Sequence, residues 1–420
     1  MKRLFYIALL LGLFSCNVTE IAVSNYDKNG DCYSVSMDDA INLAHVFSSD
    51  NGFISTRSST STVNDPFSIN DETGTPMLHV INYEGGGFII IAGDKRLRPI
   101  QAYSPLGSFS EDLKSIPLGL KIWLENTQET LNLAKEKGDV DAETRSAWAR
   151  YTNRLLTRSQ IPDPIPTEEV DTLVGPFITD YWHQYAPYND NLIIAPHYYS
   201  TDDTYAGDYK PAVGCLPLAI ARVMRYNMRP SNYSWSSMPD NSPQTTHTKS
   251  FISDVHYAVK SYSQSHGYNF NYFRIPEYNS LGVVTGYHSE TGTDHNFPIG
   301  SFMNTHFGYS AAVTESYSIN SYQKMRREMI DHLLPCIISG EVSSGGGHTW
   351  ICDGYHYNYT PGHYIGEQYI EAVYTTYLHY RWGMENSNYD GWYFHSNVNL
   401  GSFDLHYNMQ LTHHITDVYL

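Results

Sequence analysis

The sequence predicts an α+β protein made of two parts, and three observations carry that prediction. Residues 77–104 combine apolar strands with glycine-rich turns and lead into a helical pattern. Residues 158–171 hold three prolines and several acids, which disfavour regular structure and indicate a linker. From Cys336 onward, aromatic and β-branched segments alternate with turns and indicate an antiparallel sheet.

The first part is expected to hold two helices and a hairpin. A helical run occupies residues 37–47. Two apolar strands then meet across the glycines of residues 85–87, and a proline-containing turn follows at residues 98–99. A second helix is predicted over residues 116–137. Its apolar residues recur at roughly helical spacing: Leu118, Ile122, Leu124, Leu131 and Leu133.

The second part is expected to begin with helices and end as a sheet. A helix after Cys215 carries Pro217 in its first turn, where a missing N–H costs nothing. Its inner side is predicted to hold Leu218, Val223 and Met224. Another helix covers residues 322–334 and is ended by Pro335. Its expected core stripe is Met325, Met329 and Leu333.

Cys215 and His348 stand in settings that favour catalysis. Cys215 follows Gly214 at a helix start, where unpaired N–H groups and the helix dipole stabilise a thiolate. His348 follows the glycines of residues 345–347, which leave room for an extended substrate. Taken alone, each residue is more often an ordinary core side chain. Together they predict a cysteine nucleophile with a histidine that holds its proton.

The composition excludes one class of partner. The chain carries 44 acidic and 26 basic residues, a net charge of −18, without the clusters of Lys and Arg that bind phosphate backbones. We therefore expect no nucleic-acid partner. The 36 tyrosines, against 16 phenylalanines, are typical of half-buried sheets and suit surfaces that take extended polypeptides.

The start of the chain predicts export. MKRLFYIALLLGLFSC has a basic start, an apolar run too short to span a bilayer comfortably, and a small residue before Cys16. Residues 13–16 resemble a bacterial lipobox, in which the cysteine becomes the lipidated first residue of the mature protein. Plain secretion with cleavage nearby is the alternative. We interpret residues 1–16 as a signal peptide and Cys16 as the lipidation site.

Five cysteines in an exported chain leave an odd number. With the lipidated cysteine and the nucleophile set aside, Cys32, Cys336 and Cys352 remain. Cys336 and Cys352 lie on apolar strands and either face each other or fill core space, which we favour. A zinc site using His348 and Cys352 lacks a second ligand pair at familiar spacing. We therefore expect no metal and no cofactor.

The blocks around these residues resemble the streptopain-type cysteine peptidases, papain-like enzymes that bacteria make as zymogens. The resemblance covers most of the chain after residue 75. In the first half, GFIIIAGDKRLRPIQAYSPLGSF is similar to the family's propeptide. In the second half, five blocks occur in the family's order: WHQYAPYN, AVGCLPLAIARVMRYN, GYHSETGTDHNFPIGSFMNTHFGYS, GGGHTWICDGY and RWGMENSNYDGWY.

This resemblance implies a papain-like α+β fold, with a helical part and an antiparallel sheet, preceded by an α+β propeptide domain. We accordingly divide the chain into a signal peptide at residues 1–16, an inhibitory propeptide at residues 17–165 and a catalytic domain at residues 166–420. Maturation is expected to cut between Arg150 and Asp171.

The resemblance also implies roles for single residues. Cys215 matches the nucleophile, and His348 matches the general base and acid. Gln184 matches the glutamine that donates to the oxyanion. Gly347 and Thr293 match positions that bind the substrate main chain. Without the resemblance, Gln184 would be interpreted as a surface glutamine and Thr293 as an ordinary loop threonine.

One stretch departs from the family. Residues 381–384, Arg-Trp-Gly-Met, stand where the family commonly has Asn-Trp-Gly-Trp. Arg381 cannot accept a hydrogen bond from an imidazole. We therefore expect packing against Trp382, a backbone carbonyl or water to orient His348, and we include Trp382 among the catalytic residues.

The sequence thus predicts an exported, surface-anchored cysteine endopeptidase, made as a zymogen, that hydrolyses peptide bonds through Cys215 and His348. Its expected partners are extended or unfolded polypeptides, its own propeptide, and a membrane through the lipid anchor only. Its expected location is the bacterial cell envelope or surface, with release from the cell left open. Arg381 motivates a different class, a catalytically impaired surface protein that binds peptides or inhibits related proteases. An amide or acyl transferase using the same pair is a third reading.

Overall fold

A computed structural model gives the architecture of most of the chain. It describes residues 33–51, 62–157, 169–193, 210–240, 245–278, 284–318, 320–343, 345–365, 368–383, 388–395 and 409–416. The predicted signal peptide, Cys16, Cys32, Met384 and most of the proline-rich linker lie outside these ranges.

Helices occur in both parts of the chain. They are α1 (Met37–Asp50), α2 (Leu118–Lys137), α3 (Ala142–Thr157), α4 (Cys215–Asn227), α5 (Thr246–His266), α6 (Ile299–Phe307) and α7 (Ser321–Arg327), with a 3₁₀ turn η1 (Trp235–Ser237) and a π-helical turn η2 (Glu328–His332). Within the described ranges, no helix combines the length and apolar character needed to cross a bilayer.

The strands are short in the first part and longer in the second. They are β1 (Val63–Asn70), β2 (Pro76–Tyr83), β3 (Phe88–Ala92), β4 (Ile100–Ser104), β5 (Val170–Val174), β6 (Phe270–Tyr278), β7 (Val284–Thr293), β8 (Val313–Ser316), β9 (Cys336–Glu341), β10 (Gly347–Thr360), β11 (His363–Ile365), β12 (Gln368–Ile370), β13 (Val373–Arg381), β14 (Gly391–Phe394) and β15 (Gln410–His413).

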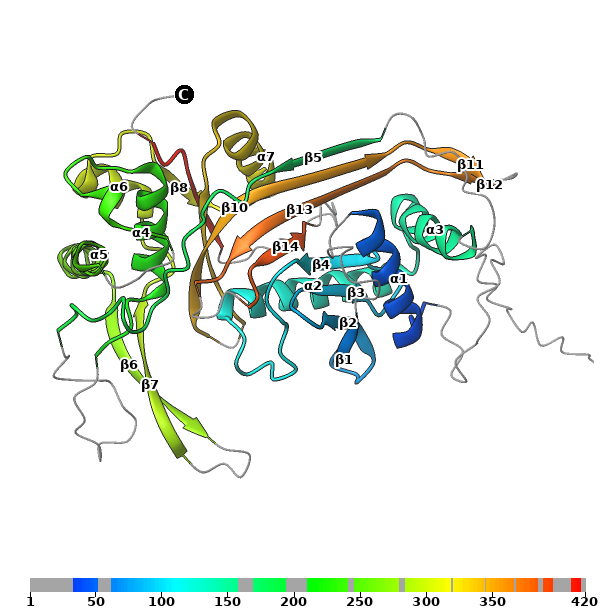
Figure 1. Ribbon diagram of the computed structural model, residues 1–420, viewed down its shortest axis with the longest axis horizontal. Coiled ribbons are helices and arrows are strands. Elements are labelled where there is room, and N and C mark those ends of the chain that lie inside the picture. Colours follow the sequence, from blue (N-terminus) through cyan, green and yellow to red (C-terminus); the bar gives the residue numbers. More distant parts are fainter. Residues whose placement is uncertain are drawn as a thin grey trace, which may run out of the picture.

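One antiparallel sheet runs through both parts of the molecule. Its order is β1-β2-β3-β4-β14-β13-β10-β9-β15-β8, and β5 pairs with β10. The two parts join where β4 pairs with β14, through Trp392 with Tyr103 and Tyr393 with Ala102. Figure 1 shows α4, α5 and α6 gathered on one side of the molecule and α1 with β1 to β4 on the other, with β10 and β13 between them.

The cores follow this arrangement. One hydrophobic cluster contains buried residues of both parts, among them Ile90 of β3, Trp350 of β10 and Tyr393 of β14. A separate cluster joins the helical side, with Val223 of α4 and Phe302 of α6. Because the first cluster spans both parts, the core of the first part is continuous with that of the second.

Local signals explain the helices that the sequence predicted. Ser36 caps α1 by accepting from the Asp39 N–H at 3.1 Å, and two acids occupy the first turn. Gly138 ends α2 in the left-handed conformation, at φ 71°. The apolar spacing of α2 also holds, since Ile122 and Leu131 are buried. On α4 the predicted inner residues Leu218, Val223 and Met224 are all buried.

The predicted helix over residues 322–334 is wrong in its second half. α7 ends at Arg327, and a π-helical turn replaces its continuation. A π turn carries more residues per turn than an α-helix, so positions after it rotate away from the predicted stripe. Met325 and Met329 are buried as expected, whereas Leu333 is 53% exposed at φ 56°.

The predicted linker is also wrong at its C-terminal end. Val170 and Asp171 already belong to β5, which pairs antiparallel with residues 355–359 of β10. β5 pairs with the edge of β10 that does not face β13, and these main-chain hydrogen bonds hold it, so its own sequence needs little strand propensity.

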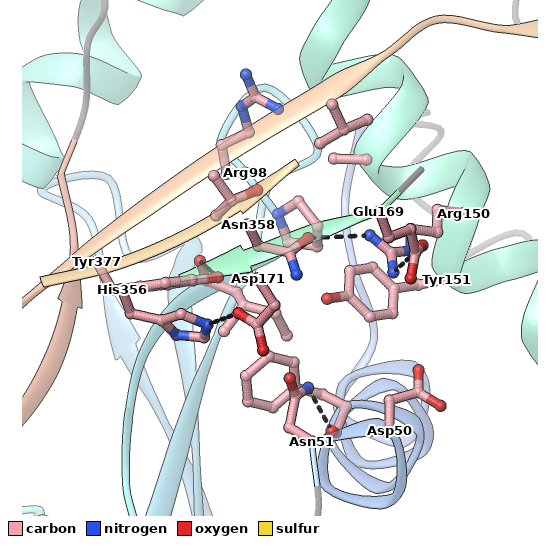
Figure 2. A pocket seen from close by; sticks show the side chains of 16 residues that line it. Asp50, Asn51, Arg98, Arg150, Tyr151, Glu169, Asp171, His356, Asn358 and Tyr377 are labelled. Atoms are coloured by element: carbon pink, nitrogen blue, oxygen red, sulfur yellow. Dashed lines mark hydrogen bonds and ion pairs between the residues drawn. The ribbon is translucent and has the colours of Figure 1, made fainter. Parts of the chain in front are cut away.

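Polar contacts bridge the two parts around a cavity of about 250 Å³ enclosed by α1, α3, β5, β10 and β13. Figure 2 shows Arg150 of α3 extended toward Glu169 and Asn358, with His356 turned to Asp171. Arg150 Nη2 lies 3.1 Å from Glu169 Oε1, and His356 Nε2 lies 2.6 Å from Asp171 Oδ1. These contacts tie both sides of the predicted linker to the same strand.

Candidate active site

Cys215 is the first residue of α4, as the sequence predicted. Gly214, at φ 94°, precedes the helix, and no side chain caps the free N–H groups of its first turn. A side chain at Gly214 would lie 3.2 Å from Pro217 and 3.3 Å from Thr291, in a conformation that L-residues rarely adopt. The glycine therefore sets the angle at which the cysteine enters the helix. Cys215 is a free cysteine and is partly exposed.

His348 lies at the start of β10 and is 8% exposed. Its Nε2 donates a 2.8 Å hydrogen bond to the main-chain oxygen of Trp382. A carbonyl can only accept, so Nε2 carries the proton, and Nδ1 remains to take the thiol proton. His348 and Cys215 hydrogen-bond through their side chains.

The two side chains change each other's pKa in opposite directions. Burial by itself would raise the pKa of the Cys215 thiol, but the charge and hydrogen bond of His348 outweigh it and lower that pKa. Burial would likewise lower the pKa of His348, yet the Cys215 thiolate and the Trp382 carbonyl raise it. The environment thus favours a thiolate beside an imidazolium.

Trp382 holds the histidine through its main chain. Its carbonyl accepts from His348, and its own N–H donates to Asp390 Oδ1 at 2.9 Å. The indole is 1% exposed, and its N–H donates to the Tyr389 carbonyl at 3.0 Å. A backbone carbonyl therefore supplies the acceptor that Arg381 cannot, which is one of the possibilities that the sequence left open.

Arg381 points its charge into a buried network. Its Nε donates to Asp353 Oδ2 at 2.9 Å, and Nη1 lies 3.5 Å from Asp390 Oδ2. Asp353 also contacts His379 Nδ1 at 2.6 Å and is fully buried. Burial would raise the pKa of Asp353, but Arg381 and His379 bring it well below its usual range. Arg381 thus compensates two buried acids and is not among the groups that shift the pKa of His348.

Gln184 lies next to the segment that precedes the nucleophile. Its carbonyl accepts from the Val213 N–H at 2.8 Å, two residues before Cys215, and Gln184 is half-buried. The neighbouring Trp182 is 1% exposed and packs against Phe251. The structure therefore brings Gln184 close to Cys215 in the fold, and its role as an oxyanion donor stays a prediction.

Gly347 lies near the segment that follows Thr293. Gly345, Gly346 and Gly347 are exposed beside the catalytic histidine. Thr293 is half-buried at the last position of β7. A side chain at Gly347 would lie 3.7 Å from Cβ of His295, two residues after Thr293. Both predicted substrate-binding residues therefore border the same region, and their roles stay predictions.

Helix α2 covers the catalytic histidine. A Cβ at Gly119 would lie 2.7 Å from the Trp382 ring and 3.0 Å from Cδ2 of His348. Glu125 accepts from the N–H and the hydroxyl of Ser343, both at 3.0 Å, just ahead of the glycine run. The first part of the chain thus packs directly on the histidine.

Sequence reasoning missed three contributors. Glu290 raises the pKa of both Cys215 and His348, so it lies near them. Asp390 supports Trp382, and Gly119 allows α2 to approach. A signal existed for the related acid Asp353, since an aspartate inside the apolar run HTWICDGY is unusual unless it is paired.

The sequence left open whether Cys336 and Cys352 face each other or fill core space. Cys336 and Cys352 are opposite each other on β9 and β10, yet both are free and buried. They fill core space, as we favoured. The group of metal-ligating side chains found in the described part of the chain does not include His348 or Cys352.

A cysteine at a helix start with a histidine held beside it defines the class of cysteine-type hydrolytic sites. Family models agree with that assignment. The Spi protease inhibitor model matches residues 33–131, and the Peptidase C10 family model matches residues 182–393, just over half of the chain. The chain belongs to the peptidase C10 family, which confirms the resemblance to streptopain-type peptidases.

Individual relatives are streptopains. Streptopain from Streptococcus pyogenes serotype M28 (strain MGAS6180) is 21% identical over 327 residues, covering 70% of this chain and 74% of that protein. Streptopain from serotype M1 matches with the same identity and coverage.

Among solved structures, a fragment of prointerpain A from Prevotella intermedia superposes with a TM-score of 0.53 at 16% identity. The match covers 85% of this chain and 99% of the fragment, and it supports the papain-like α+β fold with a preceding propeptide domain. The protein is therefore a cysteine endopeptidase that carries its own inhibitor domain.

Proposed function

We propose that this protein is an exported endopeptidase, made as a lipid-anchored zymogen, whose nucleophile is Cys215 and whose general base and acid is His348. The observation that carries the proposal is the reciprocal pKa shift of these two side chains at the start of α4. An ordinary core cysteine would have a raised pKa, as burial gives Cys336 and Cys352.

The chemistry follows from that charge state. The Cys215 thiolate attacks the scissile carbonyl carbon, and the C=O electron pair moves onto oxygen. We assign the oxyanion donors to the Gln184 amide and the Cys215 N–H, where losing one donor typically costs about 100-fold to 1000-fold in rate. The tetrahedral adduct collapses as His348 Nδ1–H protonates the leaving amine. Water deprotonated by His348 then releases the acyl group and restores the thiol.

Extended polypeptides are the substrates that this site suits. The exposed glycines of residues 345–347 leave main-chain groups open beside His348. Gly347 and Thr293 are proposed to bind substrate main chain, which gives affinity for an extended conformation without requiring one side chain.

The first part of the chain is proposed to act as the inhibitory propeptide. α2 belongs to the segment matched by the inhibitor model, and it packs Gly119 against His348 and Trp382. A substrate strand cannot occupy this space while α2 is there. Removal of residues 17–165 is then the activating step.

Anchoring through Cys16 is proposed from the lipobox-like sequence alone. Metabolic labelling with a tritiated fatty acid in a bacterial host should label the natural chain and not Cys16→Ser. Secretion of an unlabelled natural chain into the medium would contradict the anchor and leave the peptidase assignment untouched.

The catalytic pair is tested by single and double replacement. Cys215→Ala and His348→Ala should each abolish hydrolysis of casein by processed enzyme, and the double variant should lose little more, because the two act as one unit. Cys336→Ala, a cysteine far along the chain and buried in the core, serves as the control and should keep its activity. Substantial hydrolysis by Cys215→Ala would refute the assignment.

A further inference from the structure

Three side chains outside the active site converge at the end of the C-terminal strand. Glu328 opens the π-helical turn η2, and His413 and His414 close and follow β15. One ligand atom from each residue lies within 4.8 Å of the other two. Neither α4 nor the start of β10 contributes to this cluster.

These three side chains hold buried polar atoms that make no regular hydrogen bond. Glu328 is 0% exposed, and neither of its carboxylate oxygens has a hydrogen-bond partner. His413 is 6% exposed, and both of its ring nitrogens lack one, as does Nδ1 of His414. The contacts that exist are close approaches of charge. His414 Nδ1 lies 2.8 Å and His413 Nδ1 3.8 Å from the same oxygen, Glu328 Oε1, and His413 Nε2 lies 3.3 Å from Glu315 Oε1. Buried polar atoms are normally hydrogen-bonded, so five that have only such ion-pair approaches need an explanation.

The backbone turns both histidines toward the glutamate. Successive residues of a strand point to opposite faces, so His413 and His414 could not share a ligand in regular β structure. His414 has φ 52°, which breaks the alternation just after β15. Glu328 starts a π turn, a helix irregularity that is frequent at functional sites.

An ion can reach the cluster from solvent. The side chain of His414 remains 21% exposed, which leaves a path to the ligand atoms.

We propose that Glu328, His413 and His414 bind a divalent transition metal, with Zn²⁺ as the ion that suits two imidazoles and one carboxylate. An ion equidistant from atoms 4.8 Å apart would lie about 2.8 Å from each, against zinc bonds of about 2.0–2.2 Å, so small side-chain rotations close the site. Water or His332, whose ring lies 6.0 Å from that of His414, supplies the fourth ligand. The bound metal would link β15 to the π-helical turn η2. This departs from our expectation, from sequence, of a chain without metal.

The test measures zinc binding to the full chain carrying Cys215→Ala, which removes the catalytic thiol as a competing ligand and prevents self-cleavage. After stripping with a chelator, zinc is titrated in competition with a chromogenic chelator, and Co²⁺ spectra are recorded. We expect about one tight equivalent and the visible absorption of tetrahedral Co²⁺. Adding Glu328→Gln or His414→Gln should weaken zinc binding by at least about 100-fold, beyond what losing an outer-shell partner typically costs.

His247→Gln, which replaces an exposed histidine on α5, is the matched control and should bind zinc as the parent does. Circular dichroism checks that each variant is folded. Two results would overturn the proposal and leave a metal-free cluster of ion pairs. One is less than half an equivalent of zinc bound by the parent, and the other is a zinc affinity in both ligand variants equal to that of the parent. If a variant misfolds, the parent's Co²⁺ spectrum decides, since an octahedral spectrum argues against the site.

Discussion

Arg381 occupies a position where the family commonly has asparagine, and the structure explains how the site works without it. The Trp382 carbonyl accepts the hydrogen bond from His348, while the guanidinium compensates Asp353 and Asp390. The motive for an impaired, peptide-binding protein was that an arginine cannot accept the imidazole hydrogen bond. The Trp382 carbonyl accepts it instead, which removes the motive.

Replacing Arg381 should therefore affect stability more than catalysis. Arg381→Asn leaves two buried carboxylates without their cation, and breaking a buried pair typically costs about 3–5 kcal/mol. Urea unfolding of the full chain carrying Cys215→Ala should register a loss of this size. Turnover of the processed enzyme at a temperature where it is folded should change less than about threefold, because the Trp382 carbonyl remains.

Arg145 provides the control for that experiment. It pairs with Asp139 at 3.0 Å, and both side chains are more than half exposed. Arg145→Asn should cost about 1 kcal/mol or less. A large gain in turnover on Arg381→Asn would mean that the arginine acts on His348 after all.

The pH dependence of the processed enzyme follows from the directions of two pKa shifts. The pKa of Cys215 is lowered, so the thiolate persists as pH falls below the usual cysteine value of about 8.5. The pKa of His348 is raised, so the imidazolium persists as pH rises above its usual value. Activity should form a plateau around neutral pH, with an acid limb set by the thiol and an alkaline limb set by the imidazole.

Two measurements check this plateau. The kcat/KM profile for a fluorogenic peptide should be bell-shaped, with apparent constants that belong to the pair. Iodoacetamide should alkylate Cys215 rapidly well below pH 8.5. A single alkylation midpoint at that value, as for an ordinary thiol, would be incompatible with the ion pair.

At the scale of elements, we propose that α2 is the part that keeps the zymogen closed. Gly119→Ala places a methyl group 2.7 Å from the Trp382 ring, which is packed too tightly to move. Alanine favours a helix over glycine by roughly 1 kcal/mol, so α2 itself is not weakened. We expect a peptidyl thiol reagent to label Cys215 of the uncleaved Gly119→Ala variant at least about tenfold faster than Cys215 of the uncleaved natural chain.

Glu136→Ala, on the exposed side of the same helix, should label at the natural rate. The reaction is followed on gels that separate uncleaved from processed chain. Equal labelling of Gly119→Ala and the natural chain would mean that α2 does not limit access to Cys215.

Local patterns made some elements predictable. The apolar spacing of α2 and the cap of α1 are encoded within each helix, and the glycines of residues 85–87 mark the turn between β2 and β3. β5 was not predictable, because β10, far along the chain, supplies its hydrogen bonds. The π turn at Glu328 was hidden for the same reason, since α-helical spacing continued through it.

The active site, too, was predictable only in part. Cys215 and His348 were predictable because glycines beside them leave a mark in the sequence. The partner of Arg381 was not, since Asp353 is 28 residues away and only the fold brings them together. The cluster of Glu328, His413 and His414 is likewise made by tertiary structure, with no familiar ligand spacing.

At the scale of the whole molecule, maturation should cut between α3 and β5. α3 ends at Thr157 and β5 begins at Val170, so a cut between them leaves both elements intact. Mass spectrometry of processed enzyme should find a new N-terminus within residues 158–169. An N-terminus inside α3 or β5 would contradict this, and a fully active uncut chain would contradict the zymogen.

The join between β4 and β14 also makes maturation a one-way event. While the inhibitor is present, β14 is an interior strand with neighbours on both sides. After the inhibitor leaves, β14 becomes the edge strand of a smaller sheet. Edge strands expose unpaired main-chain N–H and C=O groups that can pair with another polypeptide. The released enzyme also loses more than half of the apolar cluster against which its sheet packs. A mature molecule that unfolds must therefore refold without the inhibitor, so its lifetime is governed by the barrier to unfolding rather than by an equilibrium.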